Sequence, residues 1–292
     1  MLFRSGVPAL PDAPPLAERA VTDRSRQRVA AIIAAIAASL LLLFLAVPTI
    51  ALVARGGAAG ARGLFADAEL RSAIALTVIT ATASTIIAVL LGTPLAWWLT
   101  RRTFRGRSIV DAILDLPLLI PHPVAGIALL LVLSRGSPLG AALLAVGARI
   151  VSTPLGIIAA MLFVSAPLYV SAAREAIARV DPRYEGVART LGDTEWRALR
   201  RVTLPLAGRG LLAGAVVSWA RASSEFGAIV ILAYQPRVAS VLSYDRFTSY
   251  GLREALPVAA ALLLVAIVPL VVLRALGARD RSRIAGERSA RA

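Results

Sequence analysis

The chain has 292 residues, of which 58% are hydrophobic, and it carries a formal net charge of +15. All 32 basic residues are arginine, which excludes a phosphate-binding loop ending in Gly-Lys-Ser/Thr and any lysine-based covalent chemistry. With no cysteine and a single histidine, a thiol site and a His/Cys metal cluster are excluded as well, so we expect no catalytic residue, metal or cofactor.

Six long apolar segments dominate the sequence. Each is long enough to cross about 30 Å of hydrocarbon as a helix. Only helices satisfy their own backbone groups in lipid, so we expect an all-α, polytopic membrane bundle of six transmembrane helices. Five segments contain no charged side chain, and the remaining one, residues 211–234, which is the fifth in chain order, carries only Arg221 and Glu225. The other five are residues 29–54, 72–100, 116–134, 150–173 and 255–273.

Polar segments flank the apolar ones. Residues 1–28 contain several prolines and scattered charges and are expected to form a disordered cytoplasmic tail, with a transmembrane domain at 29–275 and a cytoplasmic tail at 276–292. The first apolar segment is too long for the core of a cleaved signal peptide.

Arginine is distributed unevenly between the two sets of loops. Both tails and the loops at 101–107 and 174–209 hold 23 arginines together, against 8 in the other three loops. The positive-inside rule therefore places both termini of this multi-pass protein in the cytoplasm, with the lipid bilayer as its surroundings. The arginines flank apolar spans and lack interleaved aromatics, so nucleic acid is not expected as a partner.

The third apolar segment contains Pro117, Pro121 and Pro123 around His122. Prolines remove backbone donors, so the helix is expected to break here, which is tolerated where the break is packed or lines a cavity. Two roles remain open for His122. The favoured one is a packed, neutral side chain bonded to a freed carbonyl, and the other is a substrate ligand.

The loop at 174–207 is the one highly charged internal stretch. Asp181 followed by a proline predicts a helix start, and Gly192 predicts its end about nine residues later. Asp193 is expected to cap a second helix that carries Trp196, Leu199 and Val202 at spacings of three and ends at Leu204-Pro205. Two interpretations remain: a corner that docks onto a protein, or an amphipathic pair that lies on lipid headgroups.

The fifth apolar segment combines small and charged residues. Gly210, Gly214, Ser218 and Ala222 recur every four residues and predict close approach of another helix. Arg221 and Glu225 lie one turn apart, and buried ionisable groups in membranes usually face a cavity or a partner. A translocation route and a structural ion pair are both open. The candidate pathway residues are Ser218, Arg221, Ser223, Ser224 and Glu225.

The charged loop resembles the cytoplasmic "EAA" loop of bacterial ABC importer permeases, which docks into the ATPase subunit. Gly192 and the spacing to the Leu-Pro pair fit that pattern. The glutamate of the family, six residues before the glycine, falls on Gly186, and Glu185 stands one position early. The residues that the resemblance assigns to ATPase coupling are Glu185, Gly186, Val187, Ala188, Arg189, Thr190, Leu191, Gly192, Trp196, Leu204 and Pro205.

Residues 70–275 resemble the permeases of molybdate, tungstate and sulfate importers more widely. The segments that carry this resemblance are residues 91–96, 101–107, 116–126 and 223–228, and residues 229–234 and 244–249 look most similar to the tungstate/molybdate branch. The resemblance implies a homodimeric permease in the cell membrane that works with P-loop ATPase subunits and an extracytoplasmic substrate-binding protein. It is expected to import a tetrahedral oxyanion and to catalyse no reaction itself.

Three alternatives stay open. A sulfate/thiosulfate permease shares the same motifs. An ion-coupled secondary carrier is expected to show internal repeats and intramembrane carboxylates, of which only Glu225 is present. A membrane-bound scaffold or sensor leaves the loop motif unexplained.

Overall fold

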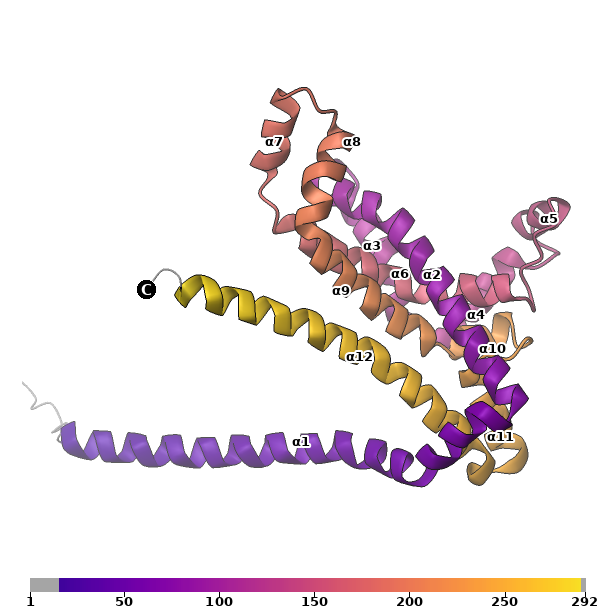
Figure 1. The fold of residues 1–292 in the computed structure, drawn as a ribbon, viewed down its shortest axis with the longest axis horizontal. Coiled ribbons are helices and arrows are strands. Elements are labelled where there is room, and N and C mark those ends of the chain that lie inside the picture. The colour runs from indigo at the N-terminus through magenta and orange to yellow at the C-terminus, as the bar shows by residue number, and fades with distance from the viewer. Residues whose placement is uncertain (1–15, 290–292) are drawn as a thin grey trace, which may run out of the picture. The chain divides into compact units, whose positions relative to one another are not determined.

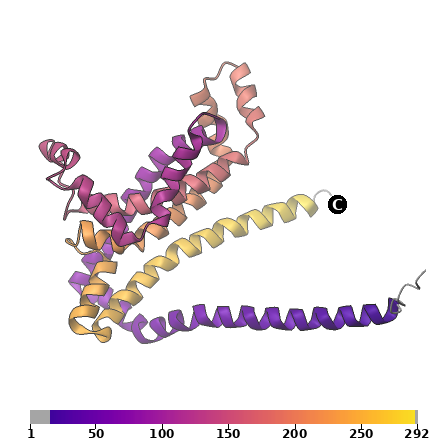
Figure 2. The same ribbon diagram turned by 180° about the vertical axis from the view of Figure 1, so that it is seen from behind.

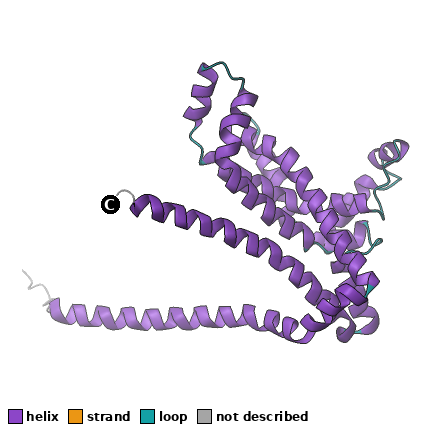
Figure 3. Ribbon diagram, in the orientation of Figure 1, coloured by secondary structure: helices purple, strands orange, loops and turns teal. Residues whose placement is uncertain are grey.

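The computed structural model describes the backbone of residues 16–289, and within that range every element is a helix (Figure 3). Side chains are described for residue 27 and for residues 29–274 except 270. The expected tails fall partly outside this range, at residues 1–15 and 290–292. The all-α fold class is confirmed for the described part of the chain.

The chain divides into two compact units, residues 1–54 and residues 55–292. The first unit consists of the beginning of α1 (Leu16–Ala66), which starts inside the segment expected to be a tail. Within residues 29–54 no side chain is buried, and the segment is strongly apolar. This composition suits a helix that meets lipid on all sides.

The second unit contains the other helices (Figure 1). Asp67 separates α1 from the next helix and caps it, since its carboxylate accepts the backbone N–H groups of Glu69 and Leu70 at 3.0 Å. Helices α2 to α7 are Ala68–Arg101, Arg107–Leu119, His122–Leu133, Pro138–Ala145, Pro154–Ala178 and Pro182–Thr190. Helices α8 to α12 are Glu195–Ala198, Leu204–Ser223, Gly227–Leu232, Ala239–Tyr250 and Leu252–Ser289, and a π-helical turn, Leu199–Thr203, joins α8 to α9.

The described residues contain five helices long and apolar enough to cross a membrane, and six if α3 and α4 count as one bent span. The break between α3 and α4 lies at the expected prolines, where the axis turns by 117°. The fifth predicted span is wrong in its bounds, because the long helix covers Glu195–Ser223 and not residues 211–234. A separate short helix, α10, begins at Gly227, and the Glu225 carboxylate just before it accepts the N–H of Ala228 at 2.9 Å.

Helices α2, α6 and α9 form the core of the second unit, and both ribbon views show them side by side (Figures 1 and 2). Close packing depends on small residues. A Cβ added to Gly92 would lie 2.8 Å from the Tyr169 ring, and one added to Gly214 would lie 2.8 Å from the Cβ of Ala172. Tyr169 is fully buried and its hydroxyl bonds that of Thr93 at 2.6 Å. The seam of small residues predicted on α9 therefore packs against α6.

The core helices carry distinct groups at their two ends. Helices α7 and α8 lie at the end where α2 finishes, and α10 and α11 lie where α2 begins (Figure 1). The charged loop and the polar residues around α11 are thus separated by the length of the core helices.

Candidate functional site

The corner between α7 and α8 forms as the sequence predicts. Asp181 accepts the N–H of Arg183 at 2.9 Å and so caps α7. Gly192 follows the helix with a φ of +95°, a conformation that side-chain-bearing residues rarely adopt. One detail is wrong: Thr194, and not Asp193, caps the second helix by accepting the N–H of Arg197 at 3.3 Å. Asp193 instead accepts from Arg201 at 3.0 Å.

The second helix does not end at Leu204 and Pro205, contrary to the prediction. The chain passes through the π-helical turn, in which the N–H of Leu204 bonds the carbonyl of Leu199, and continues into α9. Proline lacks a backbone N–H and is tolerated in the first turn of a helix. The π-helical turn ends just before Leu204, so Pro205 lies in the first turn of α9 although the helical segment as a whole continues through it. The corner is therefore continuous with the core helix α9.

An apolar patch is exposed on this corner. Tyr184 and Val187 of α7, Leu191 directly after it, and Leu206 of α9 are exposed and line a groove of about 470 Å³. Trp196 of α8 is exposed as well. Ala188 is buried beneath them, and Leu199 is 1% exposed although it was expected on the same face as Trp196. Gly186, Arg189 and Thr190 line a second, polar depression with Glu195. Such a patch, rimmed by charged residues, marks an interaction surface.

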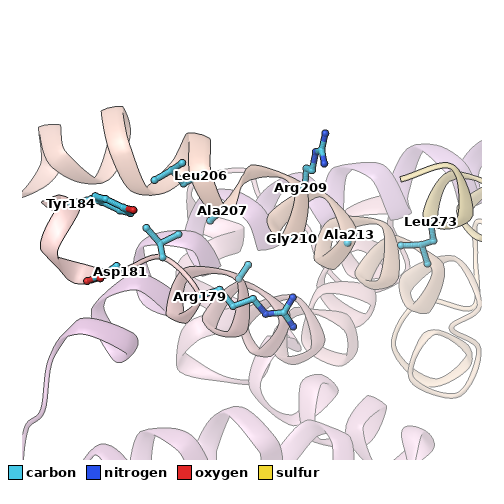
Figure 4. Close-up of a pocket in the computed structure, with 11 residues that line it drawn as sticks. Arg179, Asp181, Tyr184, Leu206, Ala207, Arg209, Gly210, Ala213 and Leu273 are labelled. Carbon is cyan, nitrogen blue, oxygen red and sulfur yellow. The ribbon is translucent and has the colours of Figure 1, made fainter. Parts of the chain in front are cut away.

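A larger hollow of about 660 Å³ lies beside the corner (Figure 4). Its lining comes from the end of α6, the start of α7, the side of α9 and Leu273 of α12. Arg179, directly after α6, and Arg209 of α9 both line it. The hollow lies between the start of α7 and the helices α6 and α9, and so leaves space beside α7.

Glu185 does not face the exposed patch. Its carboxylate accepts the Nε–H of Arg101 at 3.0 Å and the hydroxyl of Thr203 at 2.5 Å. The neighbouring arginine, Arg102, donates to both oxygens of Glu195 at 2.6 and 2.7 Å. The end of α2 is thereby bound to both helices of the corner, a relationship between distant residues that the sequence pattern does not reveal.

A second candidate site lies where the two broken segments meet. The guanidinium of Arg221 donates to Glu225 at 2.6 Å and contacts Nε2 of His122 at 2.8 Å. Glu225 is 1% exposed, and its backbone carbonyl accepts the hydroxyl of Ser240 at 2.7 Å. A Cβ on Gly227 would lie 2.7 Å from that of His122, so α10 and α4 begin in contact.

His122 differs from its favoured prediction. Its side chain is 44% exposed and contacts Arg221, not a freed carbonyl. When the guanidinium donates to Nε2, the neutral ring carries its proton on Nδ1, which lies 3.9 Å from a carboxylate oxygen of Glu225. The sequence therefore did not predict that His122 contacts Arg221. Its proline neighbours did predict the helix break at which it is partly exposed.

The five predicted pathway residues separate into two groups. Arg221, Ser224 and Glu225 lie together, with the Ser224 hydroxyl 3.4 Å from the Arg221 guanidinium. Ser218 is fully buried against α6 and donates to the Ser165 carbonyl at 3.2 Å. Ser223 is also buried and donates to the Ala220 carbonyl at 3.0 Å. Of the five residues, only Arg221 and Ser224, at the helix break, are therefore exposed or partly exposed, whereas Ser218, Ser223 and Glu225 are buried.

A network of ion pairs at the start of α2 was missed by sequence reasoning. Arg246 of α11 contacts Asp67 at 2.7 Å and Glu69 at 3.0 Å, and Arg237 contacts Glu69 at 3.4 Å and also pairs with Asp245. Burial alone would raise the pKa of the Asp67 carboxyl, but the N–H of Leu70, the Arg246 guanidinium and the N–H of Glu69 together hold it below its usual value. The network fixes α11 to the corner between α1 and α2.

Comparisons with known proteins agree on one family. The family model described as "binding-protein-dependent transport system inner membrane component" matches residues 88–283. The chain is 42% identical over 216 residues to the molybdate/tungstate transport system permease protein WtpB of Thermococcus kodakarensis, covering 74% of this chain and 82% of that protein. It is 32% identical over 243 residues to the sulfate transport system permease protein CysT of Synechocystis, covering 81% and 85%.

The fold also matches a solved membrane transporter. A chain of a bacterial ABC transporter involved in the import of the acidic polysaccharide alginate superposes with a TM-score of 0.68 at 21% sequence identity. The match covers 90% of this chain and 99% of that one. At this identity the likeness concerns the arrangement of helices.

Proposed function

The chain belongs to the inner-membrane components of binding-protein-dependent transport systems, and from this premise we propose that it is the permease subunit of an ATP-driven importer for molybdate or tungstate. The observation that carries the choice of substrate is the 42% identity to a molybdate/tungstate permease, against 32% to a sulfate permease. A sulfate/thiosulfate importer is the weaker candidate on the same comparison.

The proposed partner on the cytoplasmic side is a P-loop ATPase subunit. The chain has no lysine and so no phosphate-binding loop of that type, which makes a separate ATPase necessary. The docking surface is the exposed patch around Val187, Leu191 and Trp196. Each chain offers one such corner, and ATPase subunits of this family work as dimers, so the permease is proposed to pair with a second copy of itself. The arginine distribution supports cytoplasmic termini.

The proposed route for the anion passes the cluster of Arg221, His122 and Ser224. A tetrahedral dianion is attracted by cationic and hydroxyl groups, and these three supply both at a helix break. Glu225 neutralises Arg221 in this structure, which keeps the resting site closed to a dianion. Passage requires that the pair separates, so the arginine exchanges its internal carboxylate for the substrate. Ser218 and Ser223 then serve the packing of α9.

Reconstitution tests this proposal. The permease is purified with its cognate ATPase subunit, placed in liposomes with internal ATP, and supplied with the cognate binding protein and molybdate. We expect ATP-dependent molybdate uptake, measured by elemental mass spectrometry, and at least tenfold less uptake of sulfate. Uptake of sulfate in place of molybdate would overturn the substrate, and uptake that needs an ion gradient but no ATP would overturn the class of transporter.

A further inference from the structure

The end of α2 is joined to the docking corner by one nearly buried arginine. Arg101 donates its Nε–H to Glu185 of α7 at 3.0 Å. A second nitrogen of the same guanidinium donates to the carbonyls of Val180 at 2.8 Å and Ile177 at 3.3 Å, at the end of α6. A planar guanidinium holds several acceptors in a fixed geometry. Three elements therefore meet at a single side chain.

Glu185 is bound from a second direction as well. The oxygen that accepts from Arg101 also accepts the hydroxyl of Thr203, which is fully buried in the π-helical turn before α9. The side chains of Arg101 and Glu185 are 10% and 14% exposed, so water and salt screen their attraction little. A carboxylate held in this way is directed into the protein and away from the exposed patch.

The neighbouring pair provides a contrast. Arg102 and Glu195 form a bidentate contact between the same two regions, but their side chains are 52% and 41% exposed. An exposed ion pair transmits little force because solvent screening weakens it and the side chains reorient at small cost. Of two adjacent arginines, only Arg101 connects α2 to the corner by a rigid, shielded contact.

We propose that Arg101 is the positioning residue through which movement of α7 reaches α2, with Glu185 as its internal partner and not as a contact to the ATPase. The inference rests on the proposed function, because the movement it transmits is the one that the ATPase imposes on α7. Helix α2 packs along α6 and α9 in the core, so a displacement of its end also moves the helices packed against it. Without the contact between Arg101 and Glu185, the hollow beside α7 gives that helix room to move independently of α2.

The experiment measures molybdate imported per ATP hydrolysed in liposomes that contain the complete complex. The variants are Arg101→Ala and the near-isosteric Glu185→Gln, with Arg102→Ala as the matched control on the exposed pair. We expect Arg101→Ala and Glu185→Gln to lower the ratio at least fivefold while the ATPase still co-purifies within twofold of the parental amount. Arg102→Ala is expected to change the ratio less than twofold. The exchange Arg101→Glu with Glu185→Arg is expected to recover part of the ratio.

Two results would overturn the inference. One is a parental ratio in both Arg101→Ala and Glu185→Gln, and the other is a loss of transport that only follows a loss of bound ATPase, which would make Glu185 a docking residue. Failure of the proposed function is recognised separately, because it appears as absent molybdate uptake in the parental complex. The contact between Arg101 and Glu185 is then tested by hydrogen exchange in the permease–ATPase complex. Arg101→Ala must raise the exchange rate of the α7 amides at least threefold over that in Arg102→Ala.

Discussion

Arg221 donates to Glu225 at 2.6 Å across the end of α9, and the carboxylate of that pair is almost completely buried while the guanidinium is 23% exposed. The pair is thus accessible from the arginine side only. Glu225 also accepts the N–H of Ala228, so it has a structural partner of its own whether or not Arg221 is engaged. This asymmetry allows Arg221 to leave Glu225 without stranding the carboxylate entirely.

Single and double substitutions distinguish a pathway pair from a structural one. Arg221→Met leaves a buried carboxylate uncompensated, which costs about 3–5 kcal/mol in stability, whereas Arg221→Met with Glu225→Met removes both charges and is expected to restore assembly. Assembly is measured as monodisperse permease–ATPase complex after detergent extraction. If the cluster lines the route, the double variant assembles and imports no molybdate. Import at the parental rate by the assembled double variant would assign the pair to structure alone.

Trp196 and Leu199 test the docking surface, because they lie three residues apart but differ in burial. Trp196 is 52% exposed, so Trp196→Ala is expected to change the thermal stability of the isolated permease little and to lower ATPase co-purification several-fold. Leu199→Ala removes a buried side chain and is expected to cost about 2–5 kcal/mol. Unchanged ATPase recovery in Trp196→Ala, together with weaker binding of the loop peptide to lipid vesicles, would favour the interfacial interpretation.

The sequence patterns that succeeded rest on local physics. The lengths of the apolar segments predicted the spans Ala68–Arg101, Pro154–Ala178 and Leu252–Arg274 to within about five residues at each end, because the requirement to cross lipid does not depend on neighbouring helices. Helix α12 continues to Ser289, beyond the apolar segment. Capping chemistry predicted the start of α7, because the Asp181 side chain accepts the N–H of Arg183, only two residues away in the sequence.

The predictions that failed depend on distant contacts. The apolar segment at 211–234 was interpreted as one span, but the helix ends at Ser223, and the hydroxyl of Ser240, fifteen positions after Glu225, donates to the Glu225 carbonyl just after this break. Hydropathy does not encode such a contact. Arg221 meets His122 although they are 99 residues apart, and Arg101 meets Glu185 across 84. Such pairs form only when the core helices pack, so Glu185, Arg221 and Glu225 could be proposed from the sequence as site residues but their partners His122 and Arg101 could not.

Gly214 tests whether close packing of α9 on α6 is required. A Cβ at Gly214 would lie 2.8 Å from that of Ala172, so Gly214→Val is expected to cost about 1–3 kcal/mol through overpacking. Gly208 lies on the same helix with nothing within 4 Å of its added Cβ, so Gly208→Val is the matched control. The measurement is the fraction of permease that stays monodisperse after heating in detergent. Equal losses in the two variants would show that the effect is one of valine in a helix and not of packing.

Asp67 makes the ion-pair network at the start of α2 sensitive to acid. Because hydrogen bonds and Arg246 hold the folded pKa of Asp67 below its ordinary value of 3.8, the carboxylate stabilises the fold above that value. This contribution is lost as the pH falls through the folded pKa. Asp67→Asn keeps a side-chain acceptor for the cap but removes the charge, and it is expected to lower the melting temperature of the purified permease by a few degrees at about pH 7.

The decisive measurement for Asp67 is the difference in melting temperature between parent and Asp67→Asn as a function of pH. It is expected to be constant between about pH 7 and about pH 5 and to shrink toward zero below about pH 4, because the parent then protonates the same carboxyl. Arg246→Gln provides the control from the other side of the pair and is expected to show the same convergence. A difference that stays constant down to about pH 3 would mean that the charge of Asp67 contributes nothing to the attachment of α11.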